Sequence, residues 1–190
     1  MKATLVLADI HYPHTNLKLL RQSLEEEHDS VVLLGDSVDL AASLPELLRL
    51  VSDNGSVPVT LVRGDNEESL RIGGVDLYSA LGGRVLMVHG HQGNVANEGF
   101  TKFAARLAAR ASRRLVLSVY AMRLHRPGVF VVAGHAHALW YSRTFRVAIA
   151  GSLSTKSSSR PFNEQGYAIL SGESLTLKVD PDDPVASVKV

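Results

Sequence analysis

At 190 residues the chain is long enough for one well-buried core and too short for two ordinary domains, so we expect a single domain over residues 1–190. The sequence contains no cysteine, which excludes disulfides, thiolate nucleophiles and cysteine-based zinc sites; any metal must be held by His, Asp, Glu or Asn. No apolar run is long enough to cross a bilayer, and the apolar stretch near the amino terminus lacks the features of a secretory signal, so we expect a cytoplasmic protein.

The formal net charge of +1 conceals an uneven distribution of charge along the chain. Residues 1–98 hold fourteen of the nineteen acidic residues and only seven basic ones, whereas residues 99–163 hold eleven Lys and Arg and no acidic residue. Such asymmetry predicts a partner or substrate that carries several negative charges.

Buried strands and amphipathic helices are predicted to alternate along the first third of the chain. Short apolar runs at 3–8, 31–34 and 59–62 predict strands, and the four consecutive aliphatic residues at 31–34 suit a strand that is buried on both faces of a sheet. Apolar residues at helical spacing predict helices over 17–27 and 44–52. Further short strands are predicted at 75–77, 84–88, 129–133, 140–142, 146–149, 167–170 and 175–179.

Two later segments are predicted to lack regular structure. Residues 152–160 form a Ser-rich loop, and the Asp-Pro pattern of residues 180–184 indicates a turn before a short tail. Neither segment has the length or composition of a linker between domains, so the single-domain prediction stands.

The longest helical pattern lies between about 97 and 126. Its apolar residues form one stripe, and its basic residues, among them Lys102, Arg106 and Arg110, form another. Such a helix could present arginine to a phosphorylated substrate, lie on an anionic membrane surface, contact nucleic-acid phosphates or form the face of a homo-oligomer. The plainer alternative is a helix that packs on the core and turns its basic side to solvent.

Polar residues suited to metal binding follow five of the predicted strands. Each pair alone also occurs in ordinary turns, and histidines at strand ends often only bond to backbone. Together, because each pair follows a buried apolar run, we expect them to open on the same edge of a sheet, where α/β proteins place their ligands. The pairs are Asp9 and His11, Asp36 and Asp39, Asp65 and Asn66, His89 and His91, and His135 and His137.

This combination of motifs resembles the calcineurin-like metallophosphoesterases. The resemblance implies an α/β fold, a four-layer αββα sandwich of two mixed β-sheets flanked by helices, with a two-metal centre at the strand ends. Compared with the smallest members of the family, the chain has a longer segment at about 97–126, which resembles a helical insertion. The motifs are D-x-H at 9–11, G-D-x-x-D at 35–39, R-G-D-N-E at 63–67, H-G-H at 89–91 and G-H-x-H at 134–137.

The resemblance implies two sets of metal ligands that share the carboxylate of Asp36. The mixed shell of histidine and carboxylate suits a divalent transition metal, with manganese our first choice and iron, cobalt, nickel or zinc as alternatives. A hydroxide that bridges the two ions would attack phosphorus. The implied ligands of the first ion are Asp9, His11, Asp36 and His137, and those of the second are Asp36, Asp65, His89 and His135.

The sequence departs from the family pattern at Asn66, where phosphatases of this family usually have a histidine that assists the leaving group. Because asparagine cannot donate a proton as a general acid, we expect activity on phosphodiesters, such as a nucleotide diester, rather than on alkyl phosphomonoesters. Asp36, Asn66 and His91 are therefore the predicted catalytic residues, with His91 as a candidate substitute for the missing proton donor. Asp39 and His91 would support the metal ligands or contact the substrate.

A non-enzymatic alternative comes from the same family. The retromer subunit with this fold acts as a scaffold, and its R-G-D block is similar to the one at 63–65. We favour a metal-dependent phosphodiesterase because every other implied ligand position holds a competent residue. The alternative is a scaffold or protein-interaction subunit with little or no catalysis.

Overall fold

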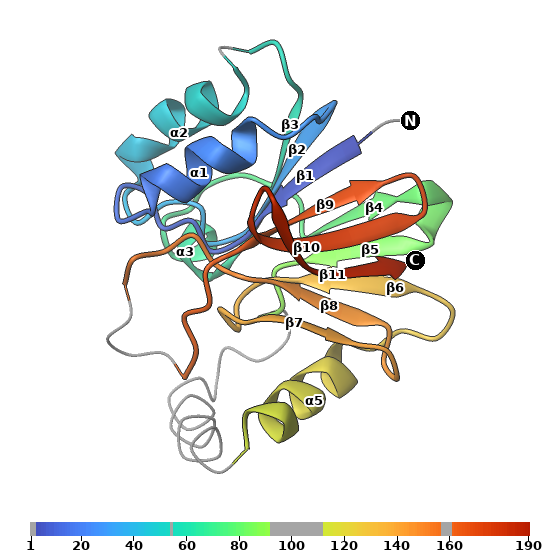
Figure 1. The fold of residues 1–190 in the computed structure, drawn as a ribbon. Helices are drawn as coiled ribbons and strands as arrows, with labels where there is room; N and C mark the ends of the chain where they lie inside the picture. The colour runs from blue at the N-terminus through green and yellow to red at the C-terminus, as the bar shows by residue number, and fades with distance from the viewer. Residues whose placement is uncertain (1–2, 54, 92–111, 157–160) are drawn as a thin grey trace.

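The computed structural model describes residues 3–53, 55–91, 112–156 and 161–190. Two mixed β-sheets face each other and helices lie on their outer faces (Figure 1), so the predicted four-layer α/β sandwich is confirmed. Among the described residues, no helix is long and apolar enough to span a membrane.

The first sheet has six strands in the order β11-β10-β9-β1-β2-β3. Its parallel half contains β1 (Ala3–Leu7), β2 (Ser30–Leu34) and β3 (Val59–Val62). The antiparallel half contains β9 (Tyr167–Ser171), β10 (Ser174–Asp180) and β11 (Asp183–Lys189).

The second sheet has five strands in the order β4-β5-β6-β8-β7. The strands β5 (Val85–Val88), β6 (Phe130–Ala133) and β8 (Val147–Ala150) are parallel. The two edge strands, β4 (Leu77–Ala80) and β7 (Leu139–Ser142), run antiparallel to their neighbours.

Alternation of side chains along the strands divides the apolar residues between two layers of core. In β2, Val32 and Leu34 point into the core between the sheets, while Val31 and Leu33 point to the outer face. The helices α1 (Leu17–Leu24) and α2 (Leu44–Val51) cover that outer face. The unbroken apolar run of β2 is therefore explained by burial on both sides.

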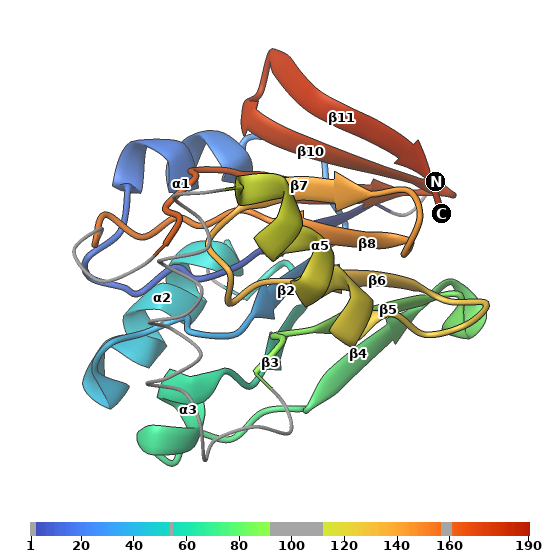
Figure 2. The ribbon, with the colours of Figure 1, turned by 90° about the horizontal axis from the view of Figure 1, so that it is seen from below.

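One longer helix, α5 (Arg113–Leu124), covers the outer face of the second sheet (Figure 2). Its Leu117 packs against Ile149 of β8, and its Ala121 packs against Val131 of β6. The remaining short helices are η1 (Ala41–Ser43), α3 (Asp65–Ser69) and η2 (Leu81–Gly83).

Several sequence-based boundaries need correction. The strand expected at 75–77 begins at Leu77, because Val75 instead forms an isolated bridge with Val62. The tail expected after 180–184 is β11, in which Ala186 and Val188 pack on the core between the sheets. The insertion predicted over 97–126 is helical in α5, while residues 92–111 lie outside the described residues.

Candidate metal centre

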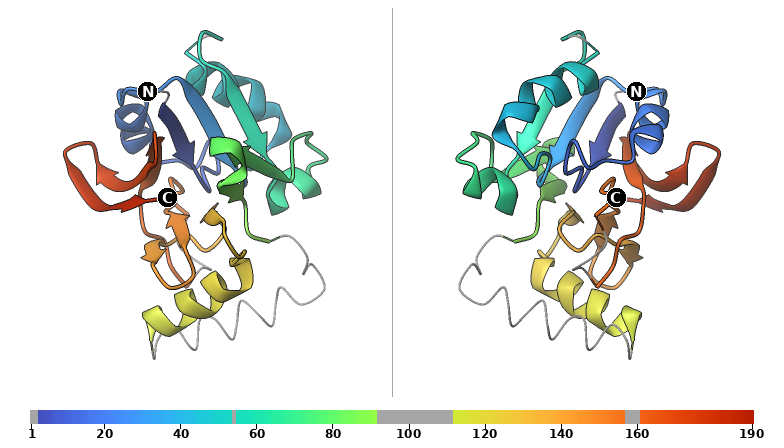
Figure 3. Two further views of the ribbon diagram at one scale, coloured as in Figure 1. Left: turned by 90° about the vertical axis from the view of Figure 1, so that its right-hand side faces the viewer. Right: turned by 90° about the vertical axis from the view of Figure 1, so that its left-hand side faces the viewer.

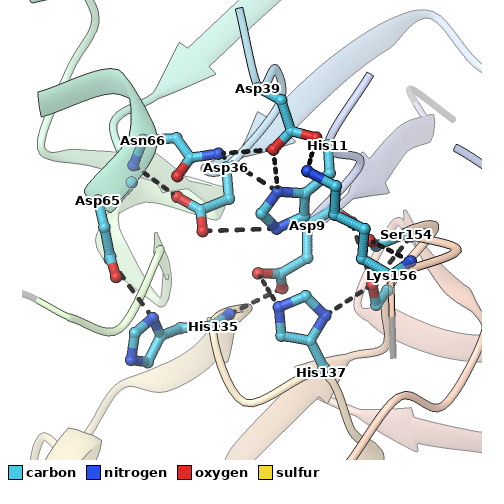
Figure 4. Close-up of polar contacts among 12 residues, drawn as sticks. Asp9, His11, Asp36, Asp39, Asp65, Asn66, His135, His137, Ser154 and Lys156 are labelled. Atoms are coloured by element: carbon cyan, nitrogen blue, oxygen red, sulfur yellow. Dashed lines mark hydrogen bonds and ion pairs between the residues drawn. The ribbon is translucent and has the colours of Figure 1, made fainter. Parts of the chain in front are cut away.

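The polar residues that follow the strands meet in one site, and Figure 4 shows those that follow β1, β2, β3 and β6. They do not share a single sheet edge, as the sequence suggested, because β1, β2 and β3 belong to one sheet whereas β5 and β6 belong to the other. The two sheets face each other (Figure 3), and contacts of His89, after β5, with Asp36, after β2, and with Asp65, after β3, show that these strand ends lie at the same end of the sandwich. All the predicted site residues are thereby brought together across the two sheets.

The backbone turns sharply where these strands end. Five predicted ligands have left-handed backbone conformations, which are uncommon for residues with a side chain and cost on the order of 1–3 kcal/mol each. Because a strained conformation persists only where its surroundings require it, this clustering favours a functional site. The φ angles are 50° at Asp9, 53° at His11, 47° at Asp36, 61° at His135 and 51° at His137.

One half of the site contains Asp9, His11 and His137, all buried and with ligand atoms within 4.8 Å of one another. His137 Nε2 lies 3.1 Å from Asp9 Oδ1, and the rings of His11 and His137 stack with centroids 5.5 Å apart. The other nitrogen of His137, Nδ1, lies 2.8 Å from Ser152 Oγ and is fixed by that contact.

The other half is built around one oxygen atom, Asp65 Oδ1. His89 Nε2 and His135 Nδ1 each lie 3.4 Å from it, and His91 Nδ1 lies 3.5 Å away. His89 is held by a contact of 2.8 Å between its Nδ1 and the carbonyl oxygen of Leu34, so its Nε2 faces the site. Asp65, His89 and His91 also form a cluster of ligand atoms within 4.8 Å of one another.

Asp36 lies between the two halves. Its Oδ2 is 3.5 Å from His11 Nε2, and its Oδ1 is 3.6 Å from His89 Nε2, so each carboxylate oxygen faces a different half. Oδ1 also accepts a hydrogen bond of 2.9 Å from the backbone N–H of Asn66. A carboxylate in this position is suited to bridging two cations.

The donor atoms fit divalent metal ions. Within the part of the chain that is described, four buried atoms of this site have no hydrogen-bond partner: Asp9 Oδ1, Asp65 Oδ1, His89 Nε2 and His91 Nδ1. Burying such atoms without a hydrogen bond costs roughly 1–3 kcal/mol each, so their gathering at one point favours a bound cation that would satisfy them. Imidazole nitrogen and carboxylate oxygen are the donors that transition metals prefer.

Neighbouring charges shift the pKa values of three residues in the site. Burial by itself lowers the pKa of His89, but nearby carboxylates, Asp36 foremost, outweigh it and raise the pKa to about 10. Burial alone would raise the pKa of Asp9, yet His137 and its neighbours hold the pKa well below its usual range. The pKa of Asp65 is lowered in the same way by adjacent histidines. In the absence of metal, a proton on His89 therefore balances part of the negative charge of the nearby carboxylates.

The two predicted catalytic residues outside the ligand sets have defined contacts. His91 Nε2 lies 2.9 Å from Glu68 Oε1, which leaves Nδ1 as the atom that faces Asp65. Asn66 Nδ2 donates to the carbonyl oxygen of Val38 at 3.0 Å and to Asp39 Oδ1 at 3.2 Å. Asn66 is thus held at the edge of the site by its amide.

The sequence-based prediction gave no role to three residues at the site, which are Glu67, Lys156 and His14. Glu67 is fully buried and accepts backbone N–H bonds from Asp36, Ser37 and Gly64 at 2.7–2.8 Å. The acidic residue in the third position after Gly64 was a signal for it, because such residues commonly cap a helix start.

The other two residues without a predicted role, Lys156 and His14, both contact Asp39. Its Oδ2 lies 2.7 Å from Lys156 Nζ and 2.7 Å from His14 Nδ1, while its Oδ1 lies 2.9 Å from His11 Nδ1. Burial would raise the pKa of Asp39, but hydrogen bonds from these three groups lower it to about 2. The sequence pattern could not predict that Lys156 lies beside Asp39, because 117 positions separate the two residues.

A family model described as the calcineurin-like phosphoesterase superfamily domain matches residues 1–174. The chain belongs to this superfamily. The motifs that carried the resemblance in the sequence are those whose side chains meet in the site. No curated protein matches the chain at a significant level of sequence similarity.

Solved structures with this superfamily fold cover the whole chain or nearly so. Vps29 from Entamoeba histolytica, complexed with zinc, is similar with a TM-score of 0.54 and 19% identity over 99% of this chain and 98% of that one. A predicted phosphoesterase from Streptococcus pneumoniae is similar with a TM-score of 0.52 and 16% identity, over 100% of this chain and 98% of that one. A dimetal phosphatase from Danio rerio is similar with a TM-score of 0.52 and 13% identity, over 99% of this chain and 98% of that one. At these identities the likeness shows the fold alone.

Proposed function

We propose that the protein is a dinuclear metal-dependent phosphodiesterase. The observation that carries this proposal is the convergence of buried carboxylate and imidazole atoms that lack hydrogen bonds, from both sheets, on the two sides of Asp36. Two bound ions would supply a nucleophilic hydroxide near neutral pH and stabilise negative charge on the phosphoryl oxygens. Manganese is our first choice, while iron, cobalt, nickel and zinc fit the same donors.

The protein's own groups would hold and orient these components. Asp9, His11 and His137 would bind one ion, and Asp65, His89 and His135 would bind the other, with Asp36 between them. Ser152 and Leu34 fix the ring orientations of His137 and His89.

We propose that His91 adds to the second set of ligands rather than acting as the proton donor. Its Nε2 is occupied by Glu68, and its buried Nδ1 faces Asp65.

The preference for diesters follows from the groups beside the site. Asn66 offers an amide N–H to Asp39 and has no proton to give to a leaving alkoxide. Lys156 and His14 contact the same carboxylate, and the ammonium group of Lys156 places a positive charge at the rim. A substrate with a good leaving group and a negatively charged phosphate fits this arrangement best, which agrees with the polyanionic substrate expected from the charge distribution. A cytoplasmic location remains part of this proposal.

The test is hydrolysis of chromogenic mono- and diesters that share one leaving group, measured with a panel of divalent metals. Asp36→Asn is the control, because it keeps the size of the side chain and removes the bridging charge. Diester hydrolysis that needs metal and falls in the variant supports the proposal. Equal activity in parent and variant contradicts the two-metal mechanism, and no hydrolysis with any metal favours the scaffold alternative.

A further inference from the structure

A groove of about 390 Å³ lies on the outer face of the second sheet, beside the carboxyl-terminal half of α5. Along β5, Val85 and Met87 point into the core between the sheets, so Leu86 and Val88 point outward. The helix α5 packs on β6 and β8, and in the part of the chain that the structure describes this outer surface of β5 is only partly covered. The floor of the groove is therefore apolar.

The groove also carries positive charge. Arg123 and Arg126 line it, and within the described residues neither forms an ion pair with a carboxylate. Arg126 Nη1 donates to the carbonyl oxygen of His125 at 3.1 Å, which leaves the rest of its guanidinium group for other contacts. Asp76 borders the groove as well, but its carboxylate contacts Arg63. An apolar floor with two arginines suits an amphipathic anion.

The groove shares a wall with the candidate metal centre. Gly90, which lines it, lies between His89 and His91. Tyr120, which also lines it, donates a hydrogen bond of 3.1 Å to the carbonyl oxygen of Gly134 and stacks on His135 with ring centroids 6.5 Å apart.

Tyr120 and Gly90 are in close contact at this wall. A Cβ atom added at Gly90 would lie 1.9 Å from Tyr120 Oη, so the tyrosine rests directly on the backbone of this loop. The groove thus begins where the second half of the metal centre ends.

We propose that this groove binds the non-reacting part of the substrate, an apolar group attached to the scissile phosphodiester and bearing a second negative charge. The apolar group would lie against Leu86 and Val88, and its acidic group would pair with Arg123 and Arg126. This inference rests on the proposed phosphodiesterase function and names the class of substrate, an amphipathic phosphodiester with a further anionic group.

The test compares two p-nitrophenyl phosphodiesters, one with a methyl group as the second substituent and one with a carboxylated naphthyl group. In the double variant Arg123→Ala/Arg126→Ala we expect KM for the naphthyl substrate to rise roughly tenfold or more, with kcat unchanged. Both constants for the methyl substrate should stay unchanged. The matched control is Arg143→Ala/Arg146→Ala, which removes two exposed arginines beyond β7 and should affect neither substrate.

Binding of anilinonaphthalene sulfonate, an aromatic anion, separates failure of this inference from failure of the proposed function. If neither diester is hydrolysed, loss of this binding in the Arg123/Arg126 variant but not in the control variant still supports the groove. Equal binding in both variants overturns it. An equal change in KM for the two diesters, or no change for either, overturns it too.

Discussion

The side-chain carboxylate of Glu67 accepts a hydrogen bond of 2.8 Å from the backbone N–H of Asp36. The same carboxylate accepts the N–H groups of Ser37 and Gly64, and the side chain is fully buried. Glu67 thereby fixes the turn in which Asp36 adopts its left-handed backbone conformation. The backbone conformation of the central carboxylate residue therefore depends on Glu67, which is not among the predicted metal ligands.

Replacing Glu67 should destabilise the protein before any effect on chemistry is considered. In Glu67→Gln the amide nitrogen faces a backbone N–H that it cannot accept, so we expect a loss of about 2 kcal/mol or more in the free energy of unfolding. Urea denaturation with a chelator present measures this without a contribution from bound metal. Glu25→Gln, the same change at an exposed position, is the control and should be near neutral. Equal stability of the two variants would show that Glu67 does not fix the turn.

Local patterns in the sequence predicted the strands and the gathering of polar residues at their ends, whereas the four-layer sandwich was implied by the resemblance of the motifs to a known family. Buried strands are visible as apolar runs, and each run ended in a polar pair. The contribution of two sheets to one site was not visible in these patterns. Lys156 and His14 were missed because they reach Asp39 through long-range packing. The β11 strand was missed because Pro184 and its acidic neighbours indicated a turn, although Ala186, Val188 and Val190 alternate toward the core.

The metal-free protein should lose a stabilising contribution from His89 as pH rises. Its pKa is raised from 6.5 to about 10 in the fold, so the contribution is complete below pH 6.5 and is lost as pH rises through 10. We expect the difference in unfolding free energy between parent and His89→Gln to shrink over this range, measured by urea denaturation in chelator. A difference that is constant or grows with pH would contradict the pairing of His89 with Asp36 and Asp65.

His91 could act as a metal ligand or as a proton donor, and the metal content of a His91 variant distinguishes these two roles. If Nδ1 is a ligand, as proposed, His91→Ala should reduce the bound metal from two ions to about one and lower turnover with it. Elemental analysis of the purified variant measures this, and His28→Ala, at a distant position, is the control. Two retained ions with abolished turnover would instead support the role of proton donor that the sequence suggested.

Lys156 should contribute to turnover without holding metal. Its Nζ contacts Asp39, which in turn contacts the ligand His11, so its charge lies at the edge of the centre. We expect Lys156→Met to lower kcat/KM for diesters by roughly 10- to 100-fold while both ions are retained. Lys189→Met, an exposed lysine on β11, is the matched control. Unchanged kcat/KM in Lys156→Met would remove Lys156 from the mechanism.

A histidine in place of Asn66 should change the substrate preference. Its ring would lie beside Asp39, where the Asn66 amide is now held, and could protonate a leaving alkoxide. We expect Asn66→His to raise hydrolysis of alkyl phosphomonoesters by about tenfold or more relative to diesters. Asn66→Gln keeps the amide and should show no such shift. If the ratio of the two activities stays the same in Asn66→His, the absent proton donor does not explain the preference.

The most direct measurement of the central claim is a titration of metal-free protein with manganese in which bound metal and diester hydrolysis are followed together. The arrangement of ligand atoms on both sides of Asp36 predicts that activity appears only as the second ion binds, and that Asp36→Asn shows no such step. Full activity with one ion bound, or two bound ions without hydrolysis of any ester, would contradict the account.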